Sequence, residues 1–403
     1  MKLLHAIKFE LKKTPWRIVL VMLCALVVMT GIQAYNEVHG EVGFTATRQS
    51  KTIMSSSNVK SFTKYAIRYL DIQIAEEKNS KKGPLATPAS KRTSNIVIKK
   101  SRLLKRAVRQ HNNHQLNQTS LDAFKSSLTD HSALVSNALL TSFFHDSSIF
   151  TENILQYLVS HHLNASLMLS PNEDVANLMG RTYSLWTLSG SQKSQYVFFV
   201  CAILLFSLIF STEQRRKTTN FMAVVPVRDT TLAFIKGSIG IGIITFGLLA
   251  AFFVSYIGIK LSPGGHPWGT FSYPHYFLFK GETHMITIGG YLLTILGIDI
   301  LWLFLLSGLA FLLTELKAPL LVQVFALSIV TFAQHLHILS AIPSAFRQYL
   351  PGNYVIVREL ILGIVQTNTP LLIGCLVLAA WGLLFWLGGC LVVTTKRKSM
   401  RLN

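Results

Sequence analysis

The sequence predicts an all-α membrane protein with six transmembrane helices and a large, mainly helical extracytoplasmic insert between the first and the second. Half of the 403 residues are hydrophobic and only 14% are charged, which is too apolar for an ordinary soluble chain of this length. The apolar residues gather into six runs, and a span needs about 20 such residues to cross about 30 Å of hydrocarbon. Basic residues concentrate in a few short segments beside these runs, as they do in proteins with a fixed membrane orientation.

The six runs are almost free of charge, since only the fourth contains an acidic residue, Asp299. They cover residues 18–36, 194–212, 237–259, 285–314, 318–346 and 360–395. All four cysteines lie within these runs, so we expect no disulfide framework in the segment that joins the first two. The first run could instead belong to a cleaved signal peptide. Ile32-Gln33-Ala34 fits the small residues of a cleavage site poorly, which favours an uncleaved anchor.

The basic residues predict the orientation. They cluster before the first run, between the second and third, and in the C-terminal tail, whereas the loops 260–284 and 347–359 carry two each. Both termini are therefore expected in the cytoplasm and the long segment outside. The chain then divides into an interfacial helix and first span at 1–36, an extracytoplasmic helical domain at 37–193, and a five-span membrane domain at 194–403.

Residues 2–14 place Leu4, Ile7 and Leu11 on one helical stripe among lysines. This pattern predicts an amphipathic helix in the membrane interface, ended by Pro15. A plain basic flank that only orients the first span is the alternative.

The insert shows helical spacing at 55–77 and 96–169, with an exposed loop expected at 79–94, where Pro, Gly, Ser and Lys are frequent. Between Lys78 and Arg109 there are eleven Lys or Arg and no acidic residue. Such a stretch attracts anionic headgroups, wall polymers or acidic peptides, or is simply a solvated surface.

Two further segments flank the later spans. The aromatic segment 260–284 reads as an external interfacial loop, with Trp268, Tyr273 and Tyr276 at headgroup level. Residues 345–370 are expected to form short helices before the sixth span.

The loop at 213–236, between the second and third runs, combines a charged start, a near-neutral middle and a basic end. The residues concerned are Glu213, Arg215, Arg216, Thr218, Pro226, Val227, Arg228 and Lys236. They resemble the cytoplasmic loop after the second span in permease subunits of type-two ABC exporters. The N-terminal helix, the six-span layout and the segment around Tyr349-Leu350-Pro351 are similar too.

The resemblance implies a short coupling helix that docks on a separate ABC ATPase subunit, which binds the ATP and Mg²⁺. It further implies a second permease copy, in a homodimer or heterodimer, and export of an amphipathic, peptide or lipid-like cargo across a bacterial cell membrane. The loop could also be a positive-inside flank with no partner. A non-transporting sensor or immunity protein, which binds a peptide or wall component through its basic external domain, is the competing class.

Catalysis by this chain is not expected. The segment Leu188-Ser189-Gly190-Ser191-Gln192 looks like an ABC ATPase signature, but the chain has no phosphate-binding GxxxxGK[ST] motif. No arrangement of residues indicates a catalytic site, a metal site or a nucleic-acid surface. Membrane lipids are expected partners.

Asp299 lies in the middle of the fourth run. A charge there costs about 2.5–3.5 kcal/mol on insertion scales, so it must face protein or water. His335 and His337 in the fifth run are possible partners. The group is either a contact in a cargo path or gate, or a polar lock between packed helices.

Overall fold

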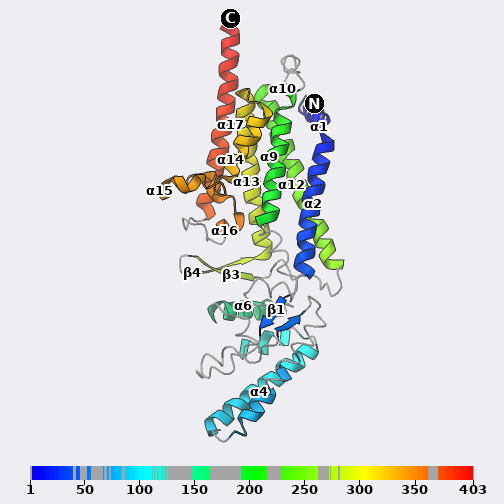
Figure 1. Ribbon diagram of the computed structural model, residues 1–403, viewed down its shortest axis with the longest axis vertical. Coiled ribbons are helices and arrows are strands. Elements are labelled where there is room, and N and C mark those ends of the chain that lie inside the picture. Colours follow the sequence, from blue (N-terminus) through cyan, green and yellow to red (C-terminus); the bar gives the residue numbers. More distant parts are fainter. Residues whose placement is uncertain are drawn as a thin grey trace.

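The computed structural model shows a bundle of long helices that carries smaller elements at one end (Figure 1). Both termini lie at the opposite end of the bundle from α4 (Pro88–Arg109) and α6 (Ser148–Ser160) (Figure 1). The structure describes residues 2–39, 42–45, 52–55, 67, 70–71, 74–83, 87–110, 112, 114–115, 117–119, 121–122, 125, 148–163, 192–215, 228–261, 272, 274–279, 282–361 and 371–402.

The chain begins with two helices that meet at a sharp bend. α1 (Lys2–Lys13) and α2 (Trp16–His39) are inclined by 76° to each other. The indole Nε1 of Trp16 donates a hydrogen bond of 2.8 Å to the carbonyl of Leu11 across this bend. The predicted helix that ends at Pro15 is therefore confirmed. Ala6 and Glu10 are buried in α1, as is Thr14 directly after it, and the three follow one another at intervals of four on one helix face.

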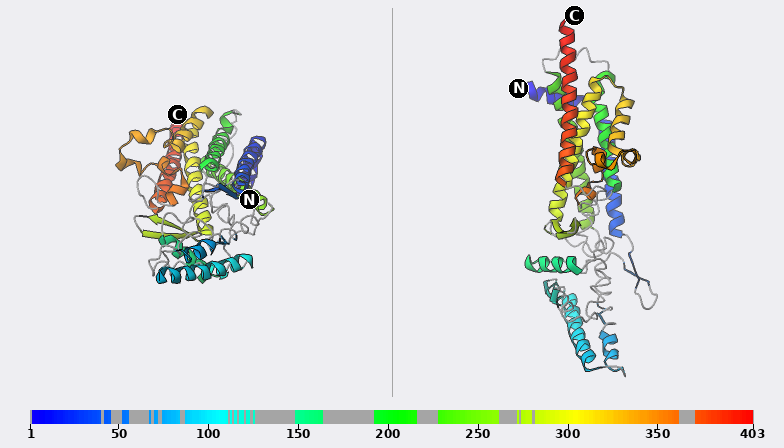
Figure 2. Two further views of the ribbon diagram at one scale, coloured as in Figure 1. Left: turned by 60° about the horizontal axis from the view of Figure 1, so that its bottom comes forward. Right: turned by 90° about the vertical axis from the view of Figure 1, so that its left-hand side faces the viewer.

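The bundle is built around α13 (Ile288–Glu315). It contacts α9 (Gln192–Phe210), α12 (Asp229–Leu261), α14 (Leu320–Phe332) and α17 (Leu371–Leu402), while α2 packs on α9 and α12 (Figures 1 and 2). Trp302 of α13 is fully buried. Its ring meets that of Phe199 edge-on, with centroids 5.2 Å apart, an arrangement that aromatic pairs favour.

α13 and α17 approach each other closely because glycines face the partner helix. A Cβ on Gly382 would lie 2.6 Å from Cδ1 of Phe304, and one on Gly308 would lie 2.7 Å from Cδ1 of Trp386. Without hydrophobic driving force between helices in lipid, small residues of this kind permit the backbone contact that holds them together.

Three described helices are long and apolar enough to cross a membrane: Asp229–Val254 in α12, Gly289–Glu315 in α13 and Leu371–Lys396 in α17. A fourth is reached if α1 and α2 count as one bent span. α9 and α14 are apolar but shorter. The chain is thus mostly helical with membrane-spanning character, whereas the six predicted spans stay a prediction.

The predicted fifth run does not form one helix. α14 ends at Phe332, and short helices follow: η2 (Ile338–Ala341), α15 (Ser344–Arg347), η3 (Pro351–Tyr354) and α16 (Val357–Ile361). The polar residues Gln334, His335 and His337 interrupt the apolar sequence, and His337 takes a positive φ of 56°.

Two of these short helices, η3 and α16, lie beside α17. The carbonyl of Tyr354 in η3 accepts a hydrogen bond of 3.1 Å from Nε1 of Trp302. Short helices were expected from residue 345, and they occur both there and earlier.

The far end of the molecule holds strands that the sequence reasoning missed. β1 (Val42–Thr45) pairs antiparallel with β2 (Thr52–Ser55), and β3 (Pro274–Phe279) pairs with β4 (Glu282–Thr287). The second hairpin occupies the end of the segment expected as an interfacial loop and the first residues of the fourth apolar run, and Tyr276 belongs to β3. Trp268 and Tyr273 lie outside the described residues.

The loop expected at 79–94 is also shorter than predicted, because α4 already begins at Pro88. A proline suits the first helical position. The hydroxyl of Thr87 accepts a hydrogen bond of 3.2 Å from the backbone N–H of Ser90, which caps the helix start.

Candidate functional site

Glu213 and Lys236, at the two ends of the predicted coupling loop, form a buried ion pair. Glu213 lies in α10 (Thr212–Arg215), which follows directly on α9, and Lys236 lies near the start of α12. Nζ of Lys236 donates a hydrogen bond to Oε2 of Glu213. The residues are 8% and 6% exposed, so the pair is shielded from solvent screening.

α1 contributes a second ion pair to the same place. Nζ of Lys13 lies 3.3 Å from Oε1 of Glu213 and 3.3 Å from Oε1 of Glu10. Glu10 is buried. The four residues Glu10, Lys13, Glu213 and Lys236, which we name the charge cluster, alternate in sign and sum to zero charge. Such mutual pairing is what allows ionic groups to be buried.

The electrostatics of the cluster favour the ionised form of Glu213. Burial alone would raise the pKa of its carboxyl, but the charge and hydrogen bond of Lys236 and the charge of Lys13 outweigh that effect. The pKa of Glu213 therefore lies below its ordinary value. The carboxylate of Glu213 thereby joins three helical elements, α1, α10 and α12.

Other contacts tie this end of the bundle to α13 and α17. Nε2 of Gln214 donates a hydrogen bond of 3.1 Å to the carbonyl of Thr314. Nζ of Lys396 lies 3.2 Å from Oε2 of Glu315. The charge cluster is thus connected, through neighbouring residues, to the ends of the helices that form the centre of the bundle.

The remaining residues of the predicted coupling loop are only partly described. Arg215 ends α10, and exposed Arg228 directly precedes α12. Arg216, Thr218, Pro226 and Val227 lie outside the described residues.

Sequence reasoning overlooked Glu10 and Lys13 as site residues. One signal was present: Glu10 is the only acidic residue in 2–14, and it shares a helix face with the small residues Ala6 and Thr14.

The three residues predicted as an intramembrane polar site, Asp299, His335 and His337, do not pair with one another in the structure. His335 accepts or donates a hydrogen bond with the hydroxyl of Tyr196, and both His335 and His337 are exposed. Asp299 is 5% exposed, and its Oδ1 has no hydrogen-bond partner among the described residues. Instead of meeting the histidines, Asp299 lines an apolar cavity of about 450 Å³ between α2, α9, α12 and α13.

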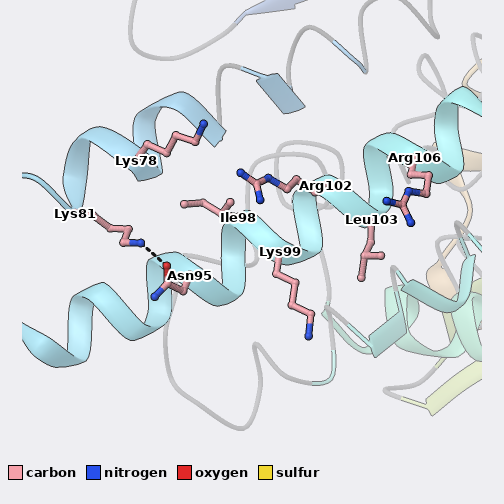
Figure 3. A pocket seen from close by; sticks show the side chains of 8 residues that line it. All are labelled: Lys78, Lys81, Asn95, Ile98, Lys99, Arg102, Leu103 and Arg106. Carbon is pink, nitrogen blue, oxygen red and sulfur yellow. Dashed lines mark hydrogen bonds between the residues drawn. The ribbon is translucent and has the colours of Figure 1, made fainter.

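The basic stretch of the insert forms a groove between the helical residues 74–80 and α4, as Figure 3 shows. Its volume is about 360 Å³, and it is lined by Lys78, Lys81, Asn95, Ile98, Lys99, Arg102, Leu103 and Arg106. Lys81 donates a hydrogen bond to Oδ1 of Asn95 (Figure 3). None of the described residues that line this groove is acidic.

Within the described part of the chain, no group of three or more His, Cys, Asp or Glu side chains could hold a metal ion. The adjacent His161 and His162 lie at the end of α6, where the ring of His161 stacks on Tyr157 with centroids 3.9 Å apart.

No protein-family model, no curated protein and no solved structure matches this chain.

Proposed function

We propose that the chain is the membrane permease subunit of an ABC-type exporter, driven by ATP that a separate subunit hydrolyses. The charge cluster carries this proposal. A loop that only oriented the spans would need basic residues, but no buried partner for Lys236 and no contact with α1. Here both ends of the loop are joined to each other and to the N-terminal helix.

This arrangement suits the transmission of force from a docked partner. A displacement of the loop acts on Glu213 and Lys236 together, and through Lys13 it acts on α1 as well. Because buried ion pairs are costly to break, the three elements would move as one unit. The cargo class remains amphipathic, peptide or lipid-like, and the permease would function as a homodimer or heterodimer in a bacterial cell membrane.

The test is co-purification with the ATPase. The full-length chain would be purified from its native membranes in mild detergent, and ATP-binding polypeptides would be identified by azido-ATP photolabelling. ATP hydrolysis by the purified material would be measured in parallel. Substituting Arg215→Ala together with Arg216→Ala should remove both signals while membrane insertion persists, because these charges border the predicted docking helix.

Lys91→Ala with Arg92→Ala is the matched control, since it removes two adjacent basic residues that are exposed on α4. This control should keep the labelled partner. If the Arg215/Arg216 variant retains labelling and hydrolysis at the wild-type level, the loop is a topogenic flank and the proposal fails.

The basic groove favours one second candidate, a non-transporting receptor for an acidic peptide or wall polymer. Five cationic side chains and, among the described residues, no acidic one line the groove (Figure 3). Saturable binding of polyglutamate to the purified chain, in the absence of any co-purifying ATPase, would support this class over the exporter.

A further inference from the structure

The cavity beside Asp299 has the size and lining of a small-molecule site. Its volume of about 450 Å³ falls within the roughly 300–1,000 Å³ of ligand pockets. Leucine and phenylalanine side chains of α2, α9, α12 and α13 form most of its wall, including Leu26, Phe198, Leu248 and Leu292. An organic ligand with an apolar body would therefore fit the lining.

Among the described residues that line this cavity, Asp299 alone has an ionisable side chain. Its Oδ1 is buried, and the described residues offer it no hydrogen bond and no ion pair. A buried carboxyl without a partner is destabilising by about 1–3 kcal/mol or more. A polar lock between packed helices would require a partner on a neighbouring helix, and the described residues contain none.

The two other polar residues of the cavity wall are already engaged with the backbone. The hydroxyl of Thr30 donates to the carbonyl of Leu26 at 2.7 Å. Oε1 of Gln195 accepts from the backbone N–H of Val357 at 3.4 Å. The carboxyl of Asp299 is thus the acidic group that faces the cavity, and a carboxylate in an apolar wall favours a positively charged partner.

The cavity reaches the lateral surface of the helix bundle. Leu249 and Leu293 line it and are also 49% and 71% exposed. Both belong to helices long enough to cross a membrane, α12 and α13. A ligand would therefore reach the cavity through an apolar opening at the side of the bundle, which suits a molecule that dissolves in lipid.

From these features we infer that the cavity binds a hydrophobic organic cation, with its apolar body among the leucines and its positive charge beside Asp299. As a site for exported cargo the inference rests on the proposed function; the binding itself does not. If the cavity holds exported cargo, that cargo is an amphipathic molecule with one cationic centre.

Binding would be measured with the full-length chain in nanodiscs of uncharged lipid, where no membrane potential drives cations inward. The probes are radiolabelled tetraphenylphosphonium and tetraphenylborate, which have the same shape and opposite charge. The wild-type chain should bind the cation saturably and the anion no more than protein-free discs do. Asp299→Asn should weaken cation binding by about tenfold or more, the equivalent of about 1.4 kcal/mol.

Leu292→Trp fills the cavity and leaves Asp299 in place, so it should abolish saturable binding even if the Asp299 variant does not fold. Glu76→Gln removes an exposed carboxyl from the helical residues 74–80 and should bind as the wild type does. Equal binding of both probes, or unchanged cation affinity in both cavity variants, would overturn the inference. Neither result bears on the ATPase co-purification, so the two proposals can fail separately.

Discussion

Lys236 and Glu213 are 23 positions apart and form an ion pair that is almost inaccessible to solvent. The pair closes the loop that joins α9 to α12, and Lys13 adds the N-terminal helix to it. Surface ion pairs contribute little to stability, but removing one partner from a buried pair leaves an uncompensated charge.

The ion pair should show strong coupling in a double-mutant cycle. Glu213→Gln leaves Lys236 buried without its carboxylate and should lower the free energy of unfolding by about 3–5 kcal/mol. Lys236→Met alone should also destabilise, while the double variant should lose much less than the sum of the two. Thermal unfolding in detergent measures all four proteins, and additive effects would show that the residues do not interact.

Stability should depend on the ionisation of Glu213. Its pKa is lowered in the folded chain because the two lysines outweigh the effect of burial, so the unfolded chain binds more protons as the solution is acidified. The contribution of ionised Glu213 to the free energy of unfolding is fully present above the ordinary pKa of a glutamate. It is lost as the pH falls through the lowered pKa of the folded chain. The melting temperature of the wild type minus that of Glu213→Gln, followed from pH 7 down to acid, should shrink. A constant difference would contradict this.

The membrane orientation can be tested by cysteine labelling in a chain whose native cysteines are replaced. An impermeant maleimide added from outside should modify a cysteine at position 120, in place of Ser120, and spare one that replaces Thr219. This follows from the basic residues of the short loops. The reverse pattern would invert the topology, and with it the cytoplasmic placement of the 213–236 loop.

The close contact of α13 and α17 should be sensitive to added volume. Gly382→Val would place side-chain atoms against Phe304, because a Cβ at this position would lie only 2.6 Å from Cδ1 of the Phe304 ring. Overpacking of this kind costs about 1–3 kcal/mol. Gly242→Val on α12 is the control, since nothing lies within 4 Å of a Cβ there. Melting temperatures of the two variants should differ clearly; equal values would mean that the helices separate without cost.

The sequence predicted the features that depend on local pattern. The bend at Pro15 and the helices in the apolar runs follow from proline geometry and hydrophobic clustering. It did not predict the end of α14 at Phe332, because the run 318–346 stays apolar enough to hide a turn. The β3–β4 hairpin was also missed, although only Lys280-Gly281 separates the two strands in the sequence.

The candidate site was predicted only in part, for a similar reason. Glu213 and Lys236 belong to one recognisable segment, whereas Glu10 and Lys13 come from a distant one and join them through tertiary packing. The cavity at Asp299 could not be seen in a sequence, since its wall combines side chains of separate helices. Of the two expected histidine partners, His335 lies on a different element and contacts Tyr196 instead of Asp299.

The charge cluster also bears on how the protein is made. Lys13 leaves the ribosome 200 positions ahead of Glu213, an interval of about 10–40 s at usual rates of synthesis. Until Glu213 and Lys236 have been made, Glu10 and Lys13 are the members of the charge cluster that can pair with each other. The whole 37–193 segment is synthesised in between. Glu213 and Lys236 then follow within 23 positions of each other, so the charge cluster can be completed only late in synthesis, and both of its remaining members become available almost together.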